Sequence, residues 1–306
     1  MGSLPPAGER PHAVMMPYPA QGHVTPMLKL AKLLHTRGFH ITFVNNEFNH
    51  LRLLGAQQSQ AAVDRLCSLP GFRFATIADG LPPSDLEASR DTPALIYSTM
   101  TTCRPRFKEL VVNLNEEAEA SGGALPPVTC VVADSITSFA ISVARELGLR
   151  CAVLWTASAC GFMGYYHYKD LLDRGLVPLK EEAQLRNGYL DTIIDWIPAM
   201  PKDLRLRDLP SYLRTVDPDD IMFNFFAEQQ TNCRFKCTEW GIGMEIGDDV
   251  RRTEVEAMIR EAMEGEQGRE MRRRVLELHQ SAVASSRRDG RSMRNVDRLI
   301  KEVLLA

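Results

Sequence analysis

The 306-residue sequence contains no long apolar run and no excess of one charge. Its apolar stretches fall well short of the roughly 18 residues of a membrane-spanning helix, so no membrane span is predicted. Lys and Arg number 36 against 39 Asp and Glu, a net charge of −3, which predicts no basic face for nucleic acid. With 44% hydrophobic residues the chain is expected to form a globular core, and its length suggests about two domains.

Cysteines are few and are not grouped as metal ligands. There are seven, an odd number that favours reduced thiols and therefore a cytoplasmic protein. Cys233 and Cys237 share one face of a predicted helix, but no histidine or second cysteine pair lies nearby, so we interpret them as core residues. No metal site is predicted. The first residues contain no apolar run of the kind found in signal peptides.

The first two-thirds of the chain alternate short β-rich runs with helical patterns. Helices are predicted over 27–37 and 138–147, each followed by a glycine at the position typical of a helix end. This alternation favours a doubly wound α/β fold, a parallel sheet with helices on both faces, and we assign residues 1–226 to one Rossmann-like domain. The predicted strands are 13–16, 41–45, 72–77, 128–133 and 151–155.

Residues 227–306 have a different composition, mostly helical and charged. Helices are predicted over 253–264, 269–284 and 292–305, with one possible strand at 243–246. We assign these residues to a second, mostly helical domain. Its arginine clusters are interpreted as solvated helix faces.

His23 lies in a Pro/Gly-rich turn between the first predicted strand and the first helix. Ligands of open α/β sheets bind beyond the carboxyl ends of the strands, where an imidazole can take a proton from a bound hydroxyl. Asp134 closes a predicted strand at the same edge and is either the partner that orients His23 or the cap of the next helix. His23 itself is either a base or an ordinary surface residue. A dinucleotide-dependent reductase is disfavoured, because residues 17–22 hold one glycine where that fingerprint needs several.

The segment Met16-Pro17-Tyr18-Pro19-Ala20-Gln21-Gly22-His23-Val24-Thr25-Pro26 resembles the N-terminal motif of plant family 1 glycosyltransferases. These enzymes have the GT-B fold and transfer a sugar from a uridine diphosphate (UDP) sugar to a small lipophilic acceptor, with inversion. The resemblance implies that His23 and Asp134 are the catalytic pair and that Gln21 and Gly22 belong to the substrate-binding loop. It also implies that Thr156 touches the donor sugar; the alternative for Thr156 is a helix cap. No cofactor beyond the co-substrate is implied.

A second block, Phe225-Phe226-Ala227-Glu228-Gln229-Gln230, resembles the end of the family's donor-binding box, with Glu228 and Gln229 in the sugar-binding positions. The rest of the box is missing: no tryptophan opens it and no His-x-Gly-x-Asn-Ser stretch occurs. We therefore predict an internal deletion near 225–226 that removes most of the donor domain. The chain is expected to be inactive or severely impaired, with glucose as the sugar expected from Glu228 and Gln229. The alternative is a non-catalytic remnant that binds an acceptor or a partner, produced by alternative splicing or a misjoined gene model.

Overall fold

A computed structural model describes residues 7–55, 57–82, 92–210, 229–246 and 250–306. The chain divides into two compact units, one of residues 1–156 and 295–306 and one of residues 157–294. The predicted domain boundary between 226 and 227 lies outside the described residues, so it stays a prediction.

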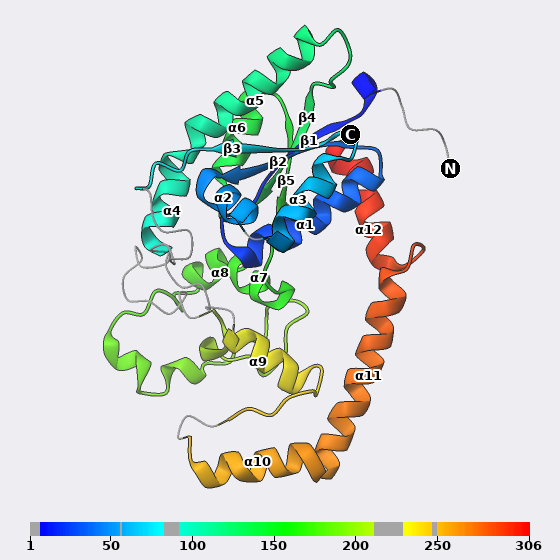
Figure 1. The fold of residues 1–306 in the computed structure, drawn as a ribbon. Coiled ribbons are helices and arrows are strands. Elements are labelled where there is room, and N and C mark those ends of the chain that lie inside the picture. Colours follow the sequence, from blue (N-terminus) through cyan, green and yellow to red (C-terminus); the bar gives the residue numbers. More distant parts are fainter. Residues whose placement is uncertain (1–6, 56, 83–91, 211–228, 247–249) are drawn as a thin grey trace. The chain divides into compact units, whose positions relative to one another are not determined.

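The first unit is built on a five-stranded sheet in the order β3-β2-β1-β4-β5 (Figure 1). All four pairings are parallel. The five predicted strands are confirmed, with ends that differ by at most one residue. They are β1 (His12–Met16), β2 (His40–Asn46), β3 (Phe72–Ile77), β4 (Val128–Asp134) and β5 (Arg150–Leu154).

Helices cover both faces of this sheet, which explains why every residue of β1 and β2 is buried. Alternate residues of a strand face opposite sides. Val14 and Met16 of β1 therefore join a core with α5 and α6, whereas Ala13 and Met15 join a core with α1. The helices of this unit are α1 (Gln21–Thr36), α2 (Glu47–Gly55), α3 (Gln57–Cys67), α4 (Thr92–Thr101), α5 (Cys103–Ala120) and α6 (Phe139–Glu146).

Helix α1 begins six residues earlier than the prediction of 27–37. The structure places Pro26, which directly precedes the predicted start, inside the helix near its beginning. A proline early in a helix removes little hydrogen bonding, because the first N–H groups have no partner within the helix. As a result His23 lies in the first turn of α1 and not in a loop, which corrects the sequence-based placement.

The described residues of the second unit form helices joined by long irregular stretches, with one isolated antiparallel bridge between Ile193 and Arg205. Its helices are α7 (Ala159–Tyr166), α8 (Tyr168–Asp173), α9 (Gln229–Thr238), α10 (Arg252–Glu264) and α11 (Glu266–Ser286), and α12 (Arg291–Leu299) follows at the return to the first unit. The three predicted helices of this region are confirmed with shifted ends. The strand predicted at 243–246 is wrong: residues 241–246 have no regular structure. A strand needs a neighbour to pair with, and the described part of this unit contains none.

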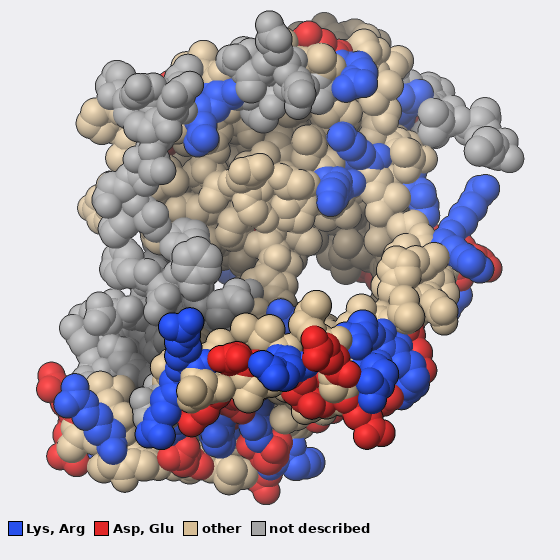
Figure 2. Space-filling model, turned by 60° about the horizontal axis from the view of Figure 1, so that its bottom comes forward, with Lys and Arg blue, Asp and Glu red and all other residues tan. Residues whose placement is uncertain are grey.

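Helices α10 and α11 leave large apolar side chains exposed. Ile259 and Met263 are 58% and 68% exposed on α10, and Leu276 is 61% exposed on α11. Cys233 on α9 is exposed as well, so its interpretation as a core residue was wrong; Cys237 is half-buried. In the lower part of the face drawn in Figure 2, acidic and basic side chains are interspersed, as expected for solvated helix faces. Among the described helices, none is long and apolar enough to cross a membrane.

Candidate active site

Three predicted site residues come from neighbouring strands of the sheet. His23 follows β1, Asp134 is the last residue of β4, and Thr156 follows β5 by two residues. These strands are adjacent and parallel, so their carboxyl ends lie at one edge. The fold therefore brings together side chains that are far apart in the sequence.

His23 and Asp134 are directly hydrogen-bonded. His23 Nδ1 lies 2.9 Å from Asp134 Oδ2, with the histidine side chain 17% exposed and the aspartate fully buried. An ionised carboxylate only accepts hydrogen bonds, so the neutral imidazole carries its hydrogen on Nδ1 and donates it to Oδ2. Within the described part of the chain, Nε2 makes no hydrogen bond. The arrangement leaves a basic nitrogen available to a ligand.

The carboxylate of Asp134 is fixed by its own turn. Oδ1 accepts the N–H of Ile136 at 3.0 Å, and the backbone N–H of Asp134 donates to Thr137 Oγ1 at 3.0 Å. The Thr137 hydroxyl also lies 3.1 Å from the Met16 carbonyl, which ties the end of β4 to the end of β1. The N-cap of α6 is Ser138, so Asp134 is not that cap.

Thr156 lies against the same imidazole nitrogen. Its Oγ1 is 3.0 Å from His23 Nδ1. The N-cap of the next helix, α7, is Ser158, whose side chain accepts the N–H of Gly161. The contact between Thr156 and the histidine ring was not predicted from the sequence, since it depends on the direction of one side chain.

The remaining predicted site residues are placed less fully. Gln21 and Gly22 form the first turn of α1 and are exposed, and nothing lies within 4 Å of the position a Gly22 side chain would take. Glu228 lies outside the described residues, and Gln229 is the first residue of α9. The roles predicted for Glu228 and Gln229 stay predictions.

Tyr18 belongs to this site although sequence reasoning gave it no role. Its ring is perpendicular to that of His23 at a centroid distance of 5.2 Å, and it is 1% exposed. Burial and the nearby charge of Asp134 raise the pKa of Tyr18, so its phenol stays neutral at pH 7. Tyr18 therefore packs against the imidazole and does not compete as a base. Its position between two prolines in the first motif was the available signal.

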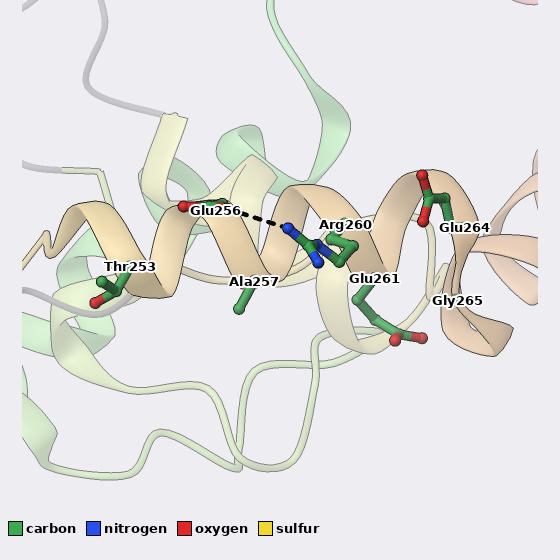
Figure 3. A pocket seen from close by; sticks show the side chains of 7 residues that line it. All are labelled: Thr253, Glu256, Ala257, Arg260, Glu261, Glu264 and Gly265. Carbon is green, nitrogen blue, oxygen red and sulfur yellow. Dashed lines mark hydrogen bonds and ion pairs between the residues drawn. The ribbon is translucent and has the colours of Figure 1, made fainter.

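A hollow of about 580 Å³ runs along α10, but its lining carries no such arrangement (Figure 3). All its lining residues come from 253–265, and none of the predicted site residues is among them. Glu256 and Arg260 form an ion pair at 3.2 Å along the helix. In the described residues, no group of three or more His, Cys, Asp or Glu side chains is placed to hold a metal ion.

Comparison with known proteins identifies a family. A family model described as "Glycosyltransferase, N-terminal domain" matches residues 11–168. A 7-deoxyloganetin glucosyltransferase of Catharanthus roseus is 34% identical over 487 aligned residues, covering 98% of both chains. An (R)-mandelonitrile beta-glucosyltransferase of Prunus dulcis is 52% identical over 221 residues, covering 72% of this chain and 44% of that protein.

Solved structures share the fold. A UDP-glucosyltransferase from Polygonum tinctorium, crystallised with 3,4-dichloroaniline, superimposes with a TM-score of 0.67 at 16% identity, covering 98% of this chain and 99% of that one. A protein from O. sativa in complex with UDP gives a TM-score of 0.62 at 14% identity, covering 95% and 99%.

The alignments also show an internal gap. The Catharanthus alignment is 487 residues long, whereas this chain has 306, so that relative has a long internal segment without a counterpart here. Other relatives match only in part: a 7-deoxyloganetin glucosyltransferase of Gardenia jasminoides is 53% identical over 227 residues, 74% of this chain and 45% of that protein. The matched part of this chain therefore spans a little under half the length of the Gardenia and Prunus relatives.

Proposed function

The chain belongs to the plant family 1 UDP-glycosyltransferases and lacks a long internal segment of its Catharanthus relative. We propose that this gap lies in the donor-binding half and that the first unit is the acceptor-binding half of an inverting sugar transfer. The observation that carries this proposal is the contact of 2.9 Å between His23 Nδ1 and the buried carboxylate of Asp134. It leaves Nε2 as the free, basic nitrogen at the ligand-binding edge of the sheet.

In the proposed reaction, His23 Nε2 takes the proton of an acceptor hydroxyl. The acceptor oxygen attacks the anomeric carbon of the UDP-sugar, and the diphosphate leaves from the opposite face, which inverts the configuration. Asp134 stabilises the imidazolium that forms and keeps its ring in place. Relatives named as glucosyltransferases of small plant metabolites favour glucose as the sugar and a small hydroxylated metabolite as the acceptor.

We further propose that this chain by itself transfers sugar poorly or not at all. The family's uracil, ribose and diphosphate contacts belong to the missing box, and only the predicted sugar contacts of Glu228 and Gln229 remain. A few hydrogen bonds, each worth about 0.5–1.5 kcal/mol net, do not reach the roughly −4 kcal/mol of millimolar binding after the cost of association. The second candidate function is therefore non-catalytic binding of an acceptor, favoured by the intact geometry around His23.

Calorimetry with UDP-glucose tests the donor half of this proposal. No saturable isotherm is expected for the chain, and no glycoside is expected from a panel of phenolic and terpenoid alcohols. A micromolar isotherm would contradict the proposal and would mean that the shortened second unit has formed a nucleotide site.

A restored chain tests the base. The internal segment of the Catharanthus relative, inserted at 225–226, supplies a donor box in place of the missing one. In a restored chain that transfers glucose, His23→Ala is expected to lower kcat by roughly 10²–10⁴-fold, the usual effect of losing a general base. His35→Ala, which removes a half-buried histidine at the other end of the same helix, is the matched control. Activity of His23→Ala within a few-fold of the parent would remove His23 from the mechanism.

A further inference from the structure

Two oxygen atoms lie at hydrogen-bond distance from a single nitrogen of His23. Asp134 Oδ2 is 2.9 Å and Thr156 Oγ1 is 3.0 Å from Nδ1. We propose that Thr156 is a positioning residue that acts through His23, holding the imidazole with Nδ1 protonated and Nε2 free. The proposal rests on the proposed role of His23 as the base and adds a second support to it.

The chemistry of the three groups sets the direction of each hydrogen bond. Asp134 can only accept, so Nδ1 carries the hydrogen. Thr156 cannot donate to a nitrogen that already bears a hydrogen, so its oxygen turns a lone pair toward that N–H as a second acceptor. When Nε2 takes a proton, Nδ1–H becomes a stronger donor, and both oxygens stabilise the cation. Thr156 therefore favours the protonated ring.

The two acceptors approach Nδ1 from consecutive strand ends. Asp134 closes β4 and Thr156 follows β5, and both strands are fixed by the sheet. One acceptor leaves the ring free to swing about the hydrogen bond, whereas two acceptors on separate strands restrict it. This restriction keeps Nε2 directed to one place, which a base needs in order to meet a bound hydroxyl.

In this arrangement the Thr156 hydroxyl oxygen accepts a hydrogen bond, and its hydrogen remains available as a donor. Among the described residues, the structure gives Thr156 no hydrogen bond other than that to His23. The hydrogen can therefore point to an oxygen of a bound ligand while the lone pair stays on Nδ1–H. Thr156 can therefore contact a sugar hydroxyl and orient His23 at the same time. Only its contact with His23 exists without a ligand.

Titration of His23 in the ligand-free chain separates these two roles. The variants are Thr156→Val, which keeps the shape but removes the acceptor, and Thr156→Ser, which keeps it. The measurement is the pH midpoint of the Cε1–H resonance of His23, assigned by its loss in His23→Ala. In Thr156→Val the midpoint is expected to fall by about 0.5–1 pH unit, since a hydrogen bond to the charged form is lost. In Thr156→Ser it should stay within about 0.2 unit of the parent.

Two controls make the result decisive. Thr36→Val removes an exposed hydroxyl that bonds only the Leu33 carbonyl in the same helix, and it should leave the His23 midpoint unchanged. Thr156→Ala removes the same acceptor without a branched side chain and should shift the midpoint in the same direction as valine. An unchanged midpoint in both Thr156→Val and Thr156→Ala would overturn the proposal and leave Thr156 as a ligand contact alone.

This outcome is independent of the proposed sugar transfer. The titration needs neither a sugar donor nor an acceptor. It therefore measures the effect of Thr156 on the His23 midpoint even in an inactive chain. Full activity of His23→Ala in the restored chain would reject the base, whereas an unshifted titration would reject only the role of Thr156. In a restored chain that is active, Thr156→Val should lower the plateau kcat more than Thr156→Ser does, and it should move the acidic limb of the pH profile to lower pH, because a base with a lower pKa stays deprotonated in more acidic solution.

Discussion

Two histidine sites lie at opposite ends of the same five-stranded sheet. At the amino end, His12 begins β1 and His40 begins β2, and the two residues are direct neighbours in the strand register. At the carboxyl end, His23 follows β1 in the first turn of α1. The two ends use the same side chain in different surroundings.

At the amino end, both nitrogens of His12 are occupied. Nδ1 lies 3.0 Å from the Pro126 carbonyl and Nε2 lies 2.8 Å from Thr42 Oγ1, and the residue is 1% exposed. Burial, together with the neighbouring His40, lowers the pKa of His12 to about 3. Burial and nearby arginines lower the pKa of His40 to about 4. At the carboxyl end the protein occupies one nitrogen of His23 and leaves the other open. An open nitrogen, and not the presence of histidine, is what distinguishes a site for chemistry from a structural one.

Acid should destabilise the protein mainly through the amino end. Both folded pKa values lie below the unfolded value of about 6.5. Below pH 6.5 the unfolded chain therefore takes up protons that the folded chain does not, and the free energy of unfolding falls as the pH drops toward 4. Above pH 6.5 the histidines are neutral in both states, and this loss is absent. The free energy of unfolding, measured by urea titration, is expected to drop by roughly 3–6 kcal/mol between pH 6.5 and pH 4. His40→Gln should make this pH dependence shallower. An equally steep loss in that variant would place the acid sensitivity elsewhere.

Removing His12 should cost more stability than removing a half-buried histidine. His12→Ala leaves a buried carbonyl and a buried hydroxyl without their partner and opens a cavity, so a loss of about 2–4 kcal/mol in the free energy of unfolding is expected. His35→Ala removes a half-buried ring that contacts the Pro70 carbonyl and the edge of Phe72, and it should cost about 1 kcal/mol or less. Similar losses in the two variants, measured at pH 7.5, would contradict the contrast between a fully buried and a half-buried ring.

Asp134→Asn should remove the basic character of the open His23 nitrogen at the carboxyl end. The amide can keep the hydrogen bond from Ile136 N–H, but it then presents its NH₂ group to Nδ1. His23 is expected to move its hydrogen to Nε2, so the open nitrogen is no longer basic. The ¹⁵N shifts of the imidazole report this change of tautomer, and the loss of stability should be only about 1 kcal/mol. Retention of the Nδ1–H form would show that Thr156 suffices to fix the tautomer.

The smallest effect is expected from a surface ion pair. Arg37, just after α1, lies 2.8 Å from Asp297 on α12, with both side chains partly exposed. Arg37→Ala should lower the free energy of unfolding by less than about 1 kcal/mol, and added salt should reduce the difference further. Leu304→Ala removes a side chain that is 2% exposed in the same tail and should cost about 2–4 kcal/mol. Equal losses would mean that charge, and not packing, holds the tail.

Much of the first unit could be predicted from the sequence because its strands are short apolar runs with clear ends. Parallel strands bring their carboxyl ends to one edge, so the meeting of His23 with Asp134 follows from the topology. The start of α1 could not be predicted, since Pro26 is compatible both with a boundary and with an early helix position. The contact of Thr156 with Nδ1 depends on a rotamer, which the sequence does not report.

The second unit was harder to predict for a physical reason. Its helices have amphipathic patterns that indicate where they start and end, but not what covers them. Cys233 and the 243–246 segment look apolar enough for a core and a strand. In the structure Cys233 is exposed, and the segment pairs with no strand among the described residues. A pattern of apolar residues predicts a buried face only where the covering element is present in the same chain.

The last twelve residues make the first unit discontinuous along the chain. Residues 295–306 belong to it, and Leu304 packs in the same core as Met27 and Leu34 of α1. Residues 157–294 are thus an insertion between two segments of the first unit. The entropic contribution to the free energy of closing a flexible loop rises by only about 0.6 kcal/mol when the loop length doubles. The free energy of docking residues 295–306 therefore depends little on the number of residues inserted before them. A fragment that stops at Thr156 lacks this tail and would have to bind it as a separate peptide.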